Sequence, residues 1–263
     1  MINVTGTKSR AETYALIANA WNNADIGTPI IVTQTNEMGG KTLEKTLVSH
    51  FPNTDTDSRN KSRIITLIKS KDTPKIIDEW MAYTTLSYVE STGYYSMPGL
   101  FGWDKIDTGS KLLIDTVTDL KGAGADFGCG YGYLTRECLA RFDDIKSIHA
   151  LDIDPRAIEA VQKNVTDTRI KAIKADCTNR VANLPPLDFI ISNPPFHTDA
   201  GEDRSLGQKF IENAYKSLRK RGLLWIVANT HMPYEKILGE TFGQFDEIIK
   251  KDGFKIIRAL KSS

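Results

Sequence analysis

The sequence has little of what marks several large classes of protein. It has three cysteines among 263 residues and no C-x-x-C pair, so neither a disulfide framework nor a cysteine zinc site is expected. The histidines show no metal-ligand spacing, and we predict no metal. No apolar run approaches the roughly 20 residues of a membrane-spanning helix, and the N-terminus has no stretch typical of a signal peptide. We therefore expect a cytoplasmic protein with no membrane partner.

Neither sign of charge is in excess. The chain has 34 Lys and Arg against 33 Asp and Glu, a formal net charge of +1. This balance excludes a protein held on nucleic acid mainly by bulk positive charge, although a local basic face is compatible with it. Hydrophobic residues make up 40% and charged residues 25%, which is typical of globular proteins and argues against disorder. The length suits one large domain or two modest ones.

Hydrophobic periodicity indicates two parts joined by a connecting segment. The first part is predicted to contain two amphipathic helices, strands at 29–35 and 63–69, and a polar loop at 52–60. The connecting segment is rich in aromatic residues and has a predicted helix across 76–86.

The second part alternates regularly between strands and helices. Its strands are predicted at 124–127, 147–152, 169–175, 187–192 and 223–228. Two further strands are expected on either side of Asp252-Gly253, a dipeptide that favours a hairpin turn. Such alternation predicts an α/β fold with a parallel sheet, helices on both faces and an antiparallel pair at one edge.

A glycine-rich turn follows the first of these strands. The segment DFGCGYG starts at Asp126 and includes Gly128, Gly130 and Gly132, which allow the backbone to approach a ligand closely. A dinucleotide site requires G-x-G-x-x-G, and Tyr133 stands where the last glycine is needed, so a nicotinamide-dependent oxidoreductase is disfavoured. Asp126 suits a ligand with an ammonium group better than a pyrophosphate. The alternative is a turn that only connects strand to helix.

Two more carboxylates follow the next two strands. Asp152 ends the second strand, where a carboxylate can accept hydrogen bonds from both hydroxyls of a ribose. Asp154 and Pro155 are instead predicted to be the N-cap and first residue of the following helix. Asp176 follows the third strand and is a candidate contact for the amino group of an adenine, or an ordinary loop carboxylate.

The fourth predicted strand ends in Asn193, Pro194, Pro195 and Phe196. The prolines make the turn rigid and leave carbonyl groups that no continuing helix or sheet can bind. The Asn193 side-chain oxygen and the Pro194 carbonyl are positioned to accept hydrogen bonds from one planar NH2 group. Phe196 offers a face for stacking a flat base. Alone, this segment is also compatible with a plain loop.

Together, DFGCGYG, LDID and NPPF resemble the class I S-adenosylmethionine-dependent methyltransferases that act on an exocyclic amine. The segments GLFGWDKIDTGSKLL and LLWIVANTHMPYEKILGETFG are similar to the ribosomal RNA small-subunit methyltransferase C family, which methylates guanine N2. The similarity is close over residues 99–260. Residues 7–70 resemble the end of that family's degenerate N-terminal methyltransferase-like domain, which is usually longer, so its early strands are expected to be missing.

The resemblance implies a domain organisation. A shortened, non-catalytic methyltransferase-like domain is expected at 1–71, a connecting segment at 72–98 and the catalytic domain at 99–263. The catalytic domain is expected to have the Rossmann-like seven-stranded sheet of class I methyltransferases, with an antiparallel terminal hairpin.

The resemblance also implies roles for the candidate residues. Gly128 and Gly130 are expected to line the methionine part of S-adenosylmethionine, Asp126 its ammonium side, Asp152 its ribose and Asp176 its adenine. The expected catalytic residues are Asn193, Pro194, Pro195 and Phe196.

The implied activity is transfer of a methyl group from S-adenosylmethionine to guanine N2 of ribosomal RNA, with 16S RNA favoured. The implied partner is ribosomal RNA or the assembled small subunit. Within the same class, alternatives are a 23S guanine, an adenine N6 or a protein glutamine, because all share the N-P-P-[FY] motif. A non-catalytic RNA-binding assembly factor is the alternative from another class.

Overall fold

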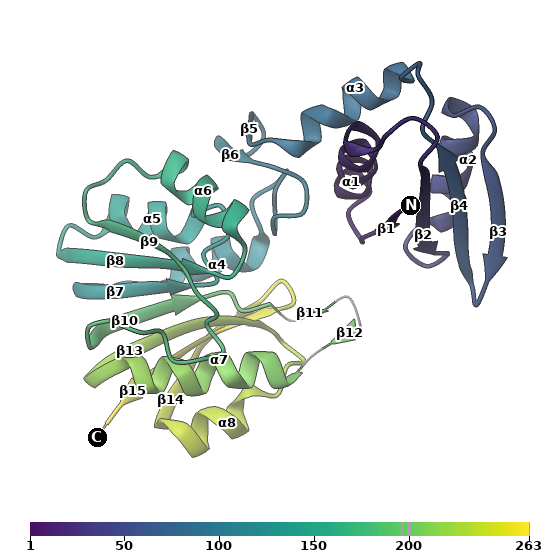
Figure 1. The fold of residues 1–263 in the computed structure, drawn as a ribbon. Coiled ribbons are helices and arrows are strands. Elements are labelled where there is room, and N and C mark those ends of the chain that lie inside the picture. The colour runs from purple at the N-terminus through teal and green to yellow at the C-terminus, as the bar shows by residue number, and fades with distance from the viewer. Residues whose placement is uncertain (196, 199–200, 203, 263) are drawn as a thin grey trace. The chain divides into compact units, whose positions relative to one another are not determined.

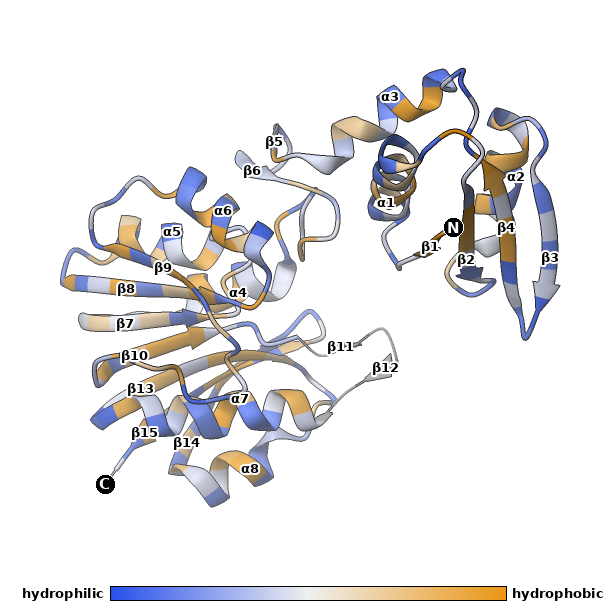
Figure 2. Cartoon of the chain, viewed as in Figure 1, coloured by the Kyte–Doolittle hydropathy of each residue, from blue (hydrophilic) through white to orange (hydrophobic). Residues whose placement is uncertain are grey.

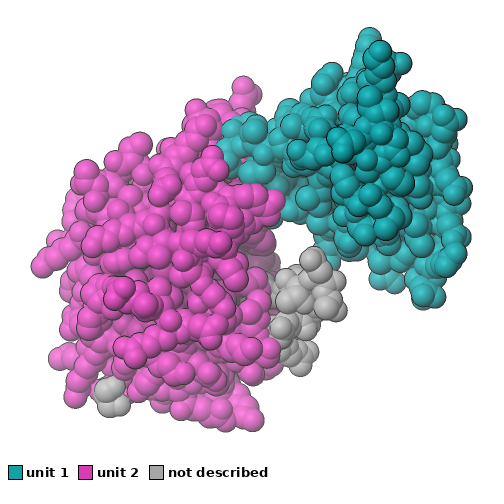
Figure 3. Space-filling model, in the orientation of Figure 1, with its two compact units in different colours: residues 1–87, 97–99 teal, residues 88–96, 100–263 magenta. Residues whose placement is uncertain are grey.

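A computed structural model describes residues 1–195, 197–198, 201–202 and 204–262, with side chains at 197, 198, 201, 202 and 204 excepted. The chain divides into two compact units (Figure 3). Unit 1 comprises residues 1–87 and 97–99, and unit 2 comprises residues 88–96 and 100–263. Within the described ranges, no helix combines the length and apolar character needed to cross a membrane.

Unit 1 is built on a four-stranded sheet in the order β1-β2-β4-β3 (Figure 1). Its elements are β1 Ile2–Thr5, α1 Arg10–Asn23, β2 Pro29–Thr35, α2 Gly40–His50, β3 Asp55–Arg59, β4 Ser62–Ile68, α3 Lys75–Met81 and the 3-10 helix η1 Ala82–Thr84. Strands β1 and β2 are parallel, and the other two pairs are antiparallel. The core of the unit includes Ile17, Trp21, Ile30 and Leu47, all essentially inaccessible to solvent.

The predicted helices of unit 1 and its strands at 29–35 and 63–69 are confirmed, but the predicted loop at 52–60 is wrong. Residues 55–59 form the edge strand β3, paired with β4 through a turn in which Asn60 and Lys61 have φ of 48° and 59°. Every residue of β3 is exposed, so no hydrophobic alternation marks it. The short strand β1 was not predicted, because only Val4 of its four residues is buried.

Unit 2 contains a seven-stranded sheet in the order β14-β15-β13-β10-β7-β8-β9. Its main elements are α4 Thr108–Thr116, β7 Gly122–Phe127, α5 Tyr133–Arg141, β8 Ile145–Asp152, α6 Pro155–Asn164, β9 Ile170–Lys174, β10 Leu187–Ser192, α7 Arg204–Ser217, β13 Leu218–Asn229, α8 Tyr234–Thr241, β14 Gly243–Lys251 and β15 Phe254–Lys261. Strands β13, β10, β7, β8 and β9 are parallel, whereas β15 is antiparallel to both its neighbours. The expected sheet with its terminal hairpin is therefore confirmed.

Two hydrophobic clusters cover the two faces of this sheet. Phe189 and Ile191 of β10 belong to the cluster that includes residues of α4, α5 and α6. Ile190, between them, belongs to the cluster with α7 and α8. This alternation is the period of two that a strand buried on both faces requires. Figure 2 shows the resulting concentration of hydrophobic residues in β10 and β13.

Short elements complete unit 2. They are β5 Ser87–Val89, whose first residue belongs to unit 1, and β6 Tyr94–Ser96, which pair with each other. The others are β11 His197–Thr198 and β12 Gly201–Glu202, which form an antiparallel pair. The predicted turn between the last two strands is confirmed. Asp252 and Gly253 have φ of 52° and 81°, the left-handed conformation that a tight two-residue hairpin requires.

Candidate active site

The predicted site residues follow neighbouring parallel strands. Asp126 lies near the end of β7, Asp152 ends β8, and Asn193 directly follows β10. In the sheet register, Asp126 is opposite Ile191 of β10 and Ala150 of β8. Because these three strands run in the same direction, their carboxyl ends meet at one edge of the sheet. This is the edge at which ligands bind in open α/β sheets.

Asp126 is fully buried, with 0% exposure. Its Oδ2 accepts a hydrogen bond of 2.7 Å from the Thr135 hydroxyl on α5, whereas its Oδ1 is buried and has no hydrogen-bond partner among the described residues. Burial is the main reason that the pKa of Asp126 is raised to about 7, and the nearby charge of Asp152 adds to it. An unpaired buried carboxylate oxygen is costly, so this atom is a strong candidate for contact with a cationic group of a ligand.

The glycines of the turn serve two purposes. Gly128 and Gly130 have φ of 76° and 52°, and a Cβ built on Gly130 would meet no atom within 4 Å. On Gly128, the nearest atom to such a Cβ would be Cε1 of Phe210, at 3.6 Å. Gly132 differs, because its Cβ would lie 2.5 Å from Cγ2 of Val161 on α6. Gly130 therefore borders open space in the turn that follows Asp126, Gly128 is in ordinary contact with Phe210, and Gly132 allows close packing of α6.

Asp152 joins the glycine turn to β8. Its Oδ2 accepts a hydrogen bond from the Gly130 N–H and its Oδ1 accepts one from the Asp154 N–H, both 2.9 Å long. Burial nevertheless raises the pKa of Asp152. Asp154 is the N-cap of α6, with its side chain accepting from the Arg156 N–H and Pro155 as the first helical residue, as predicted. Each Asp152 oxygen keeps a further lone pair that a ligand hydroxyl can use.

Asp176 is half-buried and bonded within its own turn. It accepts hydrogen bonds from the backbone N–H and the hydroxyl of Thr178 and from the side-chain amide of Asn179. The hydrogen bonds from Thr178 are the largest cause of the lowered pKa of Asp176. These contacts favour a role in the turn, and the contact with an adenine amino group remains a prediction.

Asn193 is held by two residues that the sequence did not suggest. Its Nδ2 donates hydrogen bonds to Oδ1 of Asp107 at 2.9 Å and to Oγ of Ser110 at 2.8 Å. Its Oδ1 is buried and accepts no hydrogen bond from the part of the chain that the structure describes. Pro194 is buried and Pro195 is exposed. The predicted stacking residue, Phe196, lies outside the described residues.

One signal in the sequence identifies Asp107 in part. An Asp three residues before Ser110, ahead of the apolar residues of α4, is a typical N-cap pattern. In the structure, Asp107 is the N-cap residue of α4. Its contact with Asn193, 86 positions along the chain, has no local signal.

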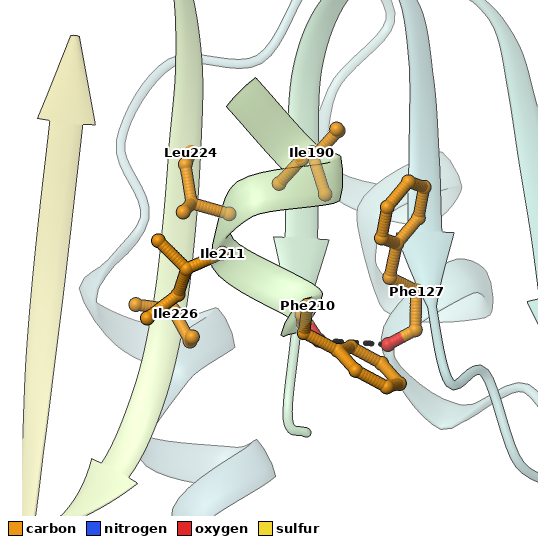
Figure 4. Close-up of a pocket in the computed structure, with 8 residues that line it drawn as sticks. Phe127, Ile190, Phe210, Ile211, Leu224 and Ile226 are labelled. Carbon is orange, nitrogen blue, oxygen red and sulfur yellow. Dashed lines mark hydrogen bonds between the residues drawn. The ribbon is translucent and has the colours of Figure 1, made fainter. Parts of the chain in front are cut away.

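An apolar crevice lies between α7 and the sheet, close to this edge (Figure 4). Its lining includes Phe127, Ile190 and Phe210. The one polar side chain in the lining, Ser192, donates its hydroxyl to the Phe127 carbonyl at 2.7 Å. The crevice therefore has no free polar group for a ligand and belongs to the packing of the core.

The unpaired groups at the sheet edge define what the site can bind. Asp126 Oδ1 and Asn193 Oδ1 are both acceptors, so a complementary ligand must bring hydrogen-bond donors. The ammonium group of S-adenosylmethionine and an exocyclic amine of a base are such donors, and Gly130 leaves open space in the turn after Asp126. The residues present therefore fit this cofactor. Among the described side chains, no group of three or more His, Cys, Asp or Glu could hold a metal ion.

Comparisons with known proteins identify the family of the chain. The family described as methyltransferase small domain matches residues 92–258. Ribosomal RNA small subunit methyltransferase C of Escherichia coli O17:K52:H18 is 31% identical over 257 residues, which cover 96% of this chain and 73% of that protein. The protein of the same name from Vibrio parahaemolyticus serotype O3:K6 is 30% identical over 259 residues, covering 97% and 75%.

A solved structure shares the fold over nearly the whole chain. It is the T. thermophilus 16S rRNA N2 G1207 methyltransferase in complex with AdoMet and guanosine, with a TM-score of 0.78 and 24% identity, covering 97% of this chain and 70% of that one. The fold and the family expected from the motifs are both confirmed. The chain belongs to the methyltransferase small domain family and, within it, to the ribosomal RNA small subunit methyltransferase C family.

Proposed function

We propose that the protein transfers a methyl group from S-adenosylmethionine to the exocyclic N2 amine of a guanine in 16S ribosomal RNA. The observation that carries the proposal is the buried, unpaired Oδ1 of Asn193 at the same sheet edge as the unpaired Oδ1 of Asp126. The names of the relatives, and the guanosine in the T. thermophilus complex, support guanine in 16S RNA as the substrate. The reaction takes place in the cytoplasm, where bacterial ribosomal RNA is found.

The cofactor side of the site consists of the glycine turn and two carboxylates. Asp126 Oδ1 accepts a hydrogen bond from the ammonium group of the cofactor, and Gly128 and Gly130 let the backbone line its methionine part. Asp152 accepts hydrogen bonds from the ribose hydroxyls, and Asp176 faces the adenine. When bound, S-adenosylmethionine supplies an activated methyl sulfonium, so the protein's main tasks are alignment and electrostatic stabilisation.

The target amine is held on the other side. The lone pair of guanine N2 is delocalised into the ring, which makes it a weak nucleophile. Asn193 Oδ1 and the Pro194 carbonyl accept hydrogen bonds from its two N–H groups, which localises the lone pair and stabilises the positive charge that develops on nitrogen. Pro195 keeps the turn rigid and Phe196 stacks on the base. The released proton passes to solvent.

We also propose that the two parts of the chain have different roles. Residues 1–71 are a shortened, non-catalytic methyltransferase-like domain, which residues 72–98 connect to the catalytic domain at 99–263. The sheet of unit 1 has four strands where that of unit 2 has seven, which supports the view that the N-terminal part is reduced.

Replacing Asp152 with alanine tests the ribose contact. The binding of S-adenosylmethionine is expected to weaken by about 1–3 kcal/mol, because the ribose hydroxyls then lose their acceptor in a buried site. This corresponds to a Kd that is roughly 5- to 150-fold higher. Isothermal titration calorimetry measures this. Asp154→Ser is the matched control, because it removes the neighbouring carboxylate and keeps a capping hydroxyl. An unchanged Kd in Asp152→Ala would place the ribose contact elsewhere.

Nucleoside mass spectrometry of ribosomal RNA tests the reaction itself. Cells without the gene are expected to lose one N2-methylguanosine from 16S RNA, and purified protein with labelled cofactor should restore it on naked 16S RNA or on unmodified small subunits. Whichever of these two substrates accepts the label identifies the form of the partner. Loss from 23S RNA, loss of a methyladenosine, or no loss at all would refute the assignment to a 16S guanine. Failure to bind the cofactor would favour an RNA-binding assembly factor.

A further inference from the structure

We propose that Asp107 and Ser110 are positioning residues that hold the Asn193 amide with its Oδ1 toward the target amine. This inference rests on the proposed function, because it assigns a purpose to the orientation of Asn193. An asparagine side chain has a donor end and an acceptor end of nearly the same shape. Only one of its two orientations presents an acceptor to an incoming NH2 group, so a site that uses Oδ1 needs a device that prevents the other.

The hydrogen bonds of Asn193 constitute such a device. Both hydrogens of Nδ2 are used, one by Asp107 Oδ1 at 2.9 Å and one by Ser110 Oγ at 2.8 Å. Rotating the amide by a half-turn would put Asn193 Oδ1 against the Asp107 carboxylate, so two acceptors would face each other in a partly buried place with no hydrogen between them. The rotated form would lose the hydrogen bond and add repulsion between the two oxygens. The observed orientation is therefore strongly preferred, and it leaves Oδ1 as the unpaired atom.

Asp107 is itself held in place by α4. Its Oδ1 also accepts a 2.7 Å hydrogen bond from the Ser110 N–H, and it is the N-cap residue of the helix. Acidic residues are common at helix N-termini because they interact favourably with the helix dipole. Gly109 completes the arrangement, because a Cβ there would lie 3.2 Å from Asp107 Oδ1 and 2.8 Å from Cε1 of Phe254. The acceptors that orient Asn193 thus sit on one rigid helix N-terminus.

In this arrangement, the free-energy cost of fixing the Asn193 amide in one orientation falls on folding and not on the binding of the base. A freely rotating amide would populate both orientations and would have to select one when the base arrives. An amide locked before the reaction needs no reorganisation at that moment, which is how preorganised polar groups accelerate chemistry. The locking should therefore affect kcat, while the binding of S-adenosylmethionine and of RNA, which do not depend on it, should change little.

Three variants of the full-length protein separate orientation from helix capping. Asp107→Ser keeps a good N-cap, but its side chain is too short to reach Asn193 as well. Asp107→Asn keeps an Oδ1 that can accept from both partners and is the conservative rescue. Ser110→Ala removes one acceptor and leaves the capped backbone N–H intact. The Ser9→Ala variant in unit 1, which loses the N-cap of α1, controls for the general effect of lower stability.

We expect Asp107→Ser to lower kcat by about 30-fold and Ser110→Ala by about tenfold, with Kd for S-adenosylmethionine and KM for the RNA changed less than about threefold. Asp107→Asn should stay within about threefold of the wild type. Equal kcat in Asp107→Ser and Asp107→Asn would overturn the proposal. The proposal would also be overturned if Asp107→Ser changed only the Kd, or if it only lowered the stability to the same extent as Ser9→Ala does.

Hydrogen exchange of the Asn193 side-chain amide does not depend on turnover, so it tests the orientation of this amide even if the proposed reaction is wrong. The side-chain NH2 signals of Asn193, assigned by their loss in Asn193→Ser, are expected to exchange slowly with solvent in the wild type and in Asp107→Asn. Exchange should be at least about tenfold faster in Asp107→Ser. Slow exchange in all three proteins would overturn the locking. An inactive wild type with the expected exchange pattern would instead refute the reaction and leave the oriented amide intact.

Discussion

Replacing Asn193 with alanine is expected to lower kcat by about a thousandfold, while the Kd for S-adenosylmethionine changes by less than about threefold. In the proposed reaction, the substitution removes an acceptor for the amine on which positive charge develops, so the loss falls on the transition state. The proposed cofactor contacts, Asp126 and Asp152, lie at the ends of β7 and β8, which the change does not touch. Single-turnover kinetics with labelled cofactor and unmodified 16S RNA, together with calorimetry, would measure both quantities.

The structure also offers a control for this experiment. Asn229 ends β13, the strand next to β10, and is therefore an asparagine at the same edge of the same sheet. Asn229→Ala should keep kcat within about threefold of the wild type. If Asn193→Ala retained turnover, the amine would be bound by other groups. If it lost cofactor binding and stability together, Asn193 would be a structural residue.

Replacing Asp126 with asparagine is expected to make the cofactor-free protein more stable and its cofactor binding weaker. The pKa of Asp126 is about 7 in the folded protein against an ordinary value of 3.8, because burial disfavours the ionised form. The folded state therefore holds its proton more tightly than the unfolded state does. The stability that this provides is complete below about pH 4 and is lost as the pH rises to about 7, by roughly 4 kcal/mol in total.

Asparagine removes this pH dependence and keeps an oxygen that can accept from Thr135. At pH 8 the variant should exceed the wild type in free energy of unfolding by up to about 4 kcal/mol, and at pH 4 the difference should largely vanish. Urea unfolding at several pH values would measure it. Other groups that titrate in this range affect both proteins, so the difference between them isolates Asp126. If the free energies of unfolding of the two proteins changed with pH in the same way, Asp126 would ionise normally in the folded chain.

Cofactor binding should respond to pH in the opposite direction. The ammonium group favours ionised Asp126, so the wild-type affinity for S-adenosylmethionine is expected to rise between pH 5 and pH 7, by up to about tenfold per pH unit. The Asp126→Asn variant should show no such rise and should bind about tenfold or more weakly at pH 7. A variant that gained stability and kept full affinity would contradict the contact between Asp126 and the ammonium group.

Much of unit 2 was predictable because its signals are local. The strand before Asp126, the glycines after it, the cap at Asp154 and the hairpin at Asp252-Gly253 each depend on a few consecutive residues. The order of these motifs along the chain then predicted a parallel sheet, since the chain must return between neighbouring strands. Edge strand β3 was missed for the same reason, because its polar residues carry no local pattern.

The roles of individual side chains were harder to predict from the sequence. Asp126 and Asp176 both follow a strand of the same sheet, and from the sequence both were candidate ligands. The structure buries Asp126 with one oxygen unpaired, whereas Asp176 is half-buried and bonded to Thr178 and Asn179. Which carboxylate has a free oxygen depends on the donors that packing brings to it.

By itself, the sequence determined the class of fold, the edge of the sheet that carries the site and the residue types at that edge. Only the tertiary structure decided which lone pairs remain unpaired and which way the Asn193 amide points, through acceptors on Asp107 and Ser110 more than 80 positions away. The physical reason is the separation along the chain of the residues that take part in each kind of interaction. Helix caps, turns and strand periodicity arise from neighbours along the chain, whereas hydrogen-bond satisfaction in a buried site is settled between elements that meet only after folding.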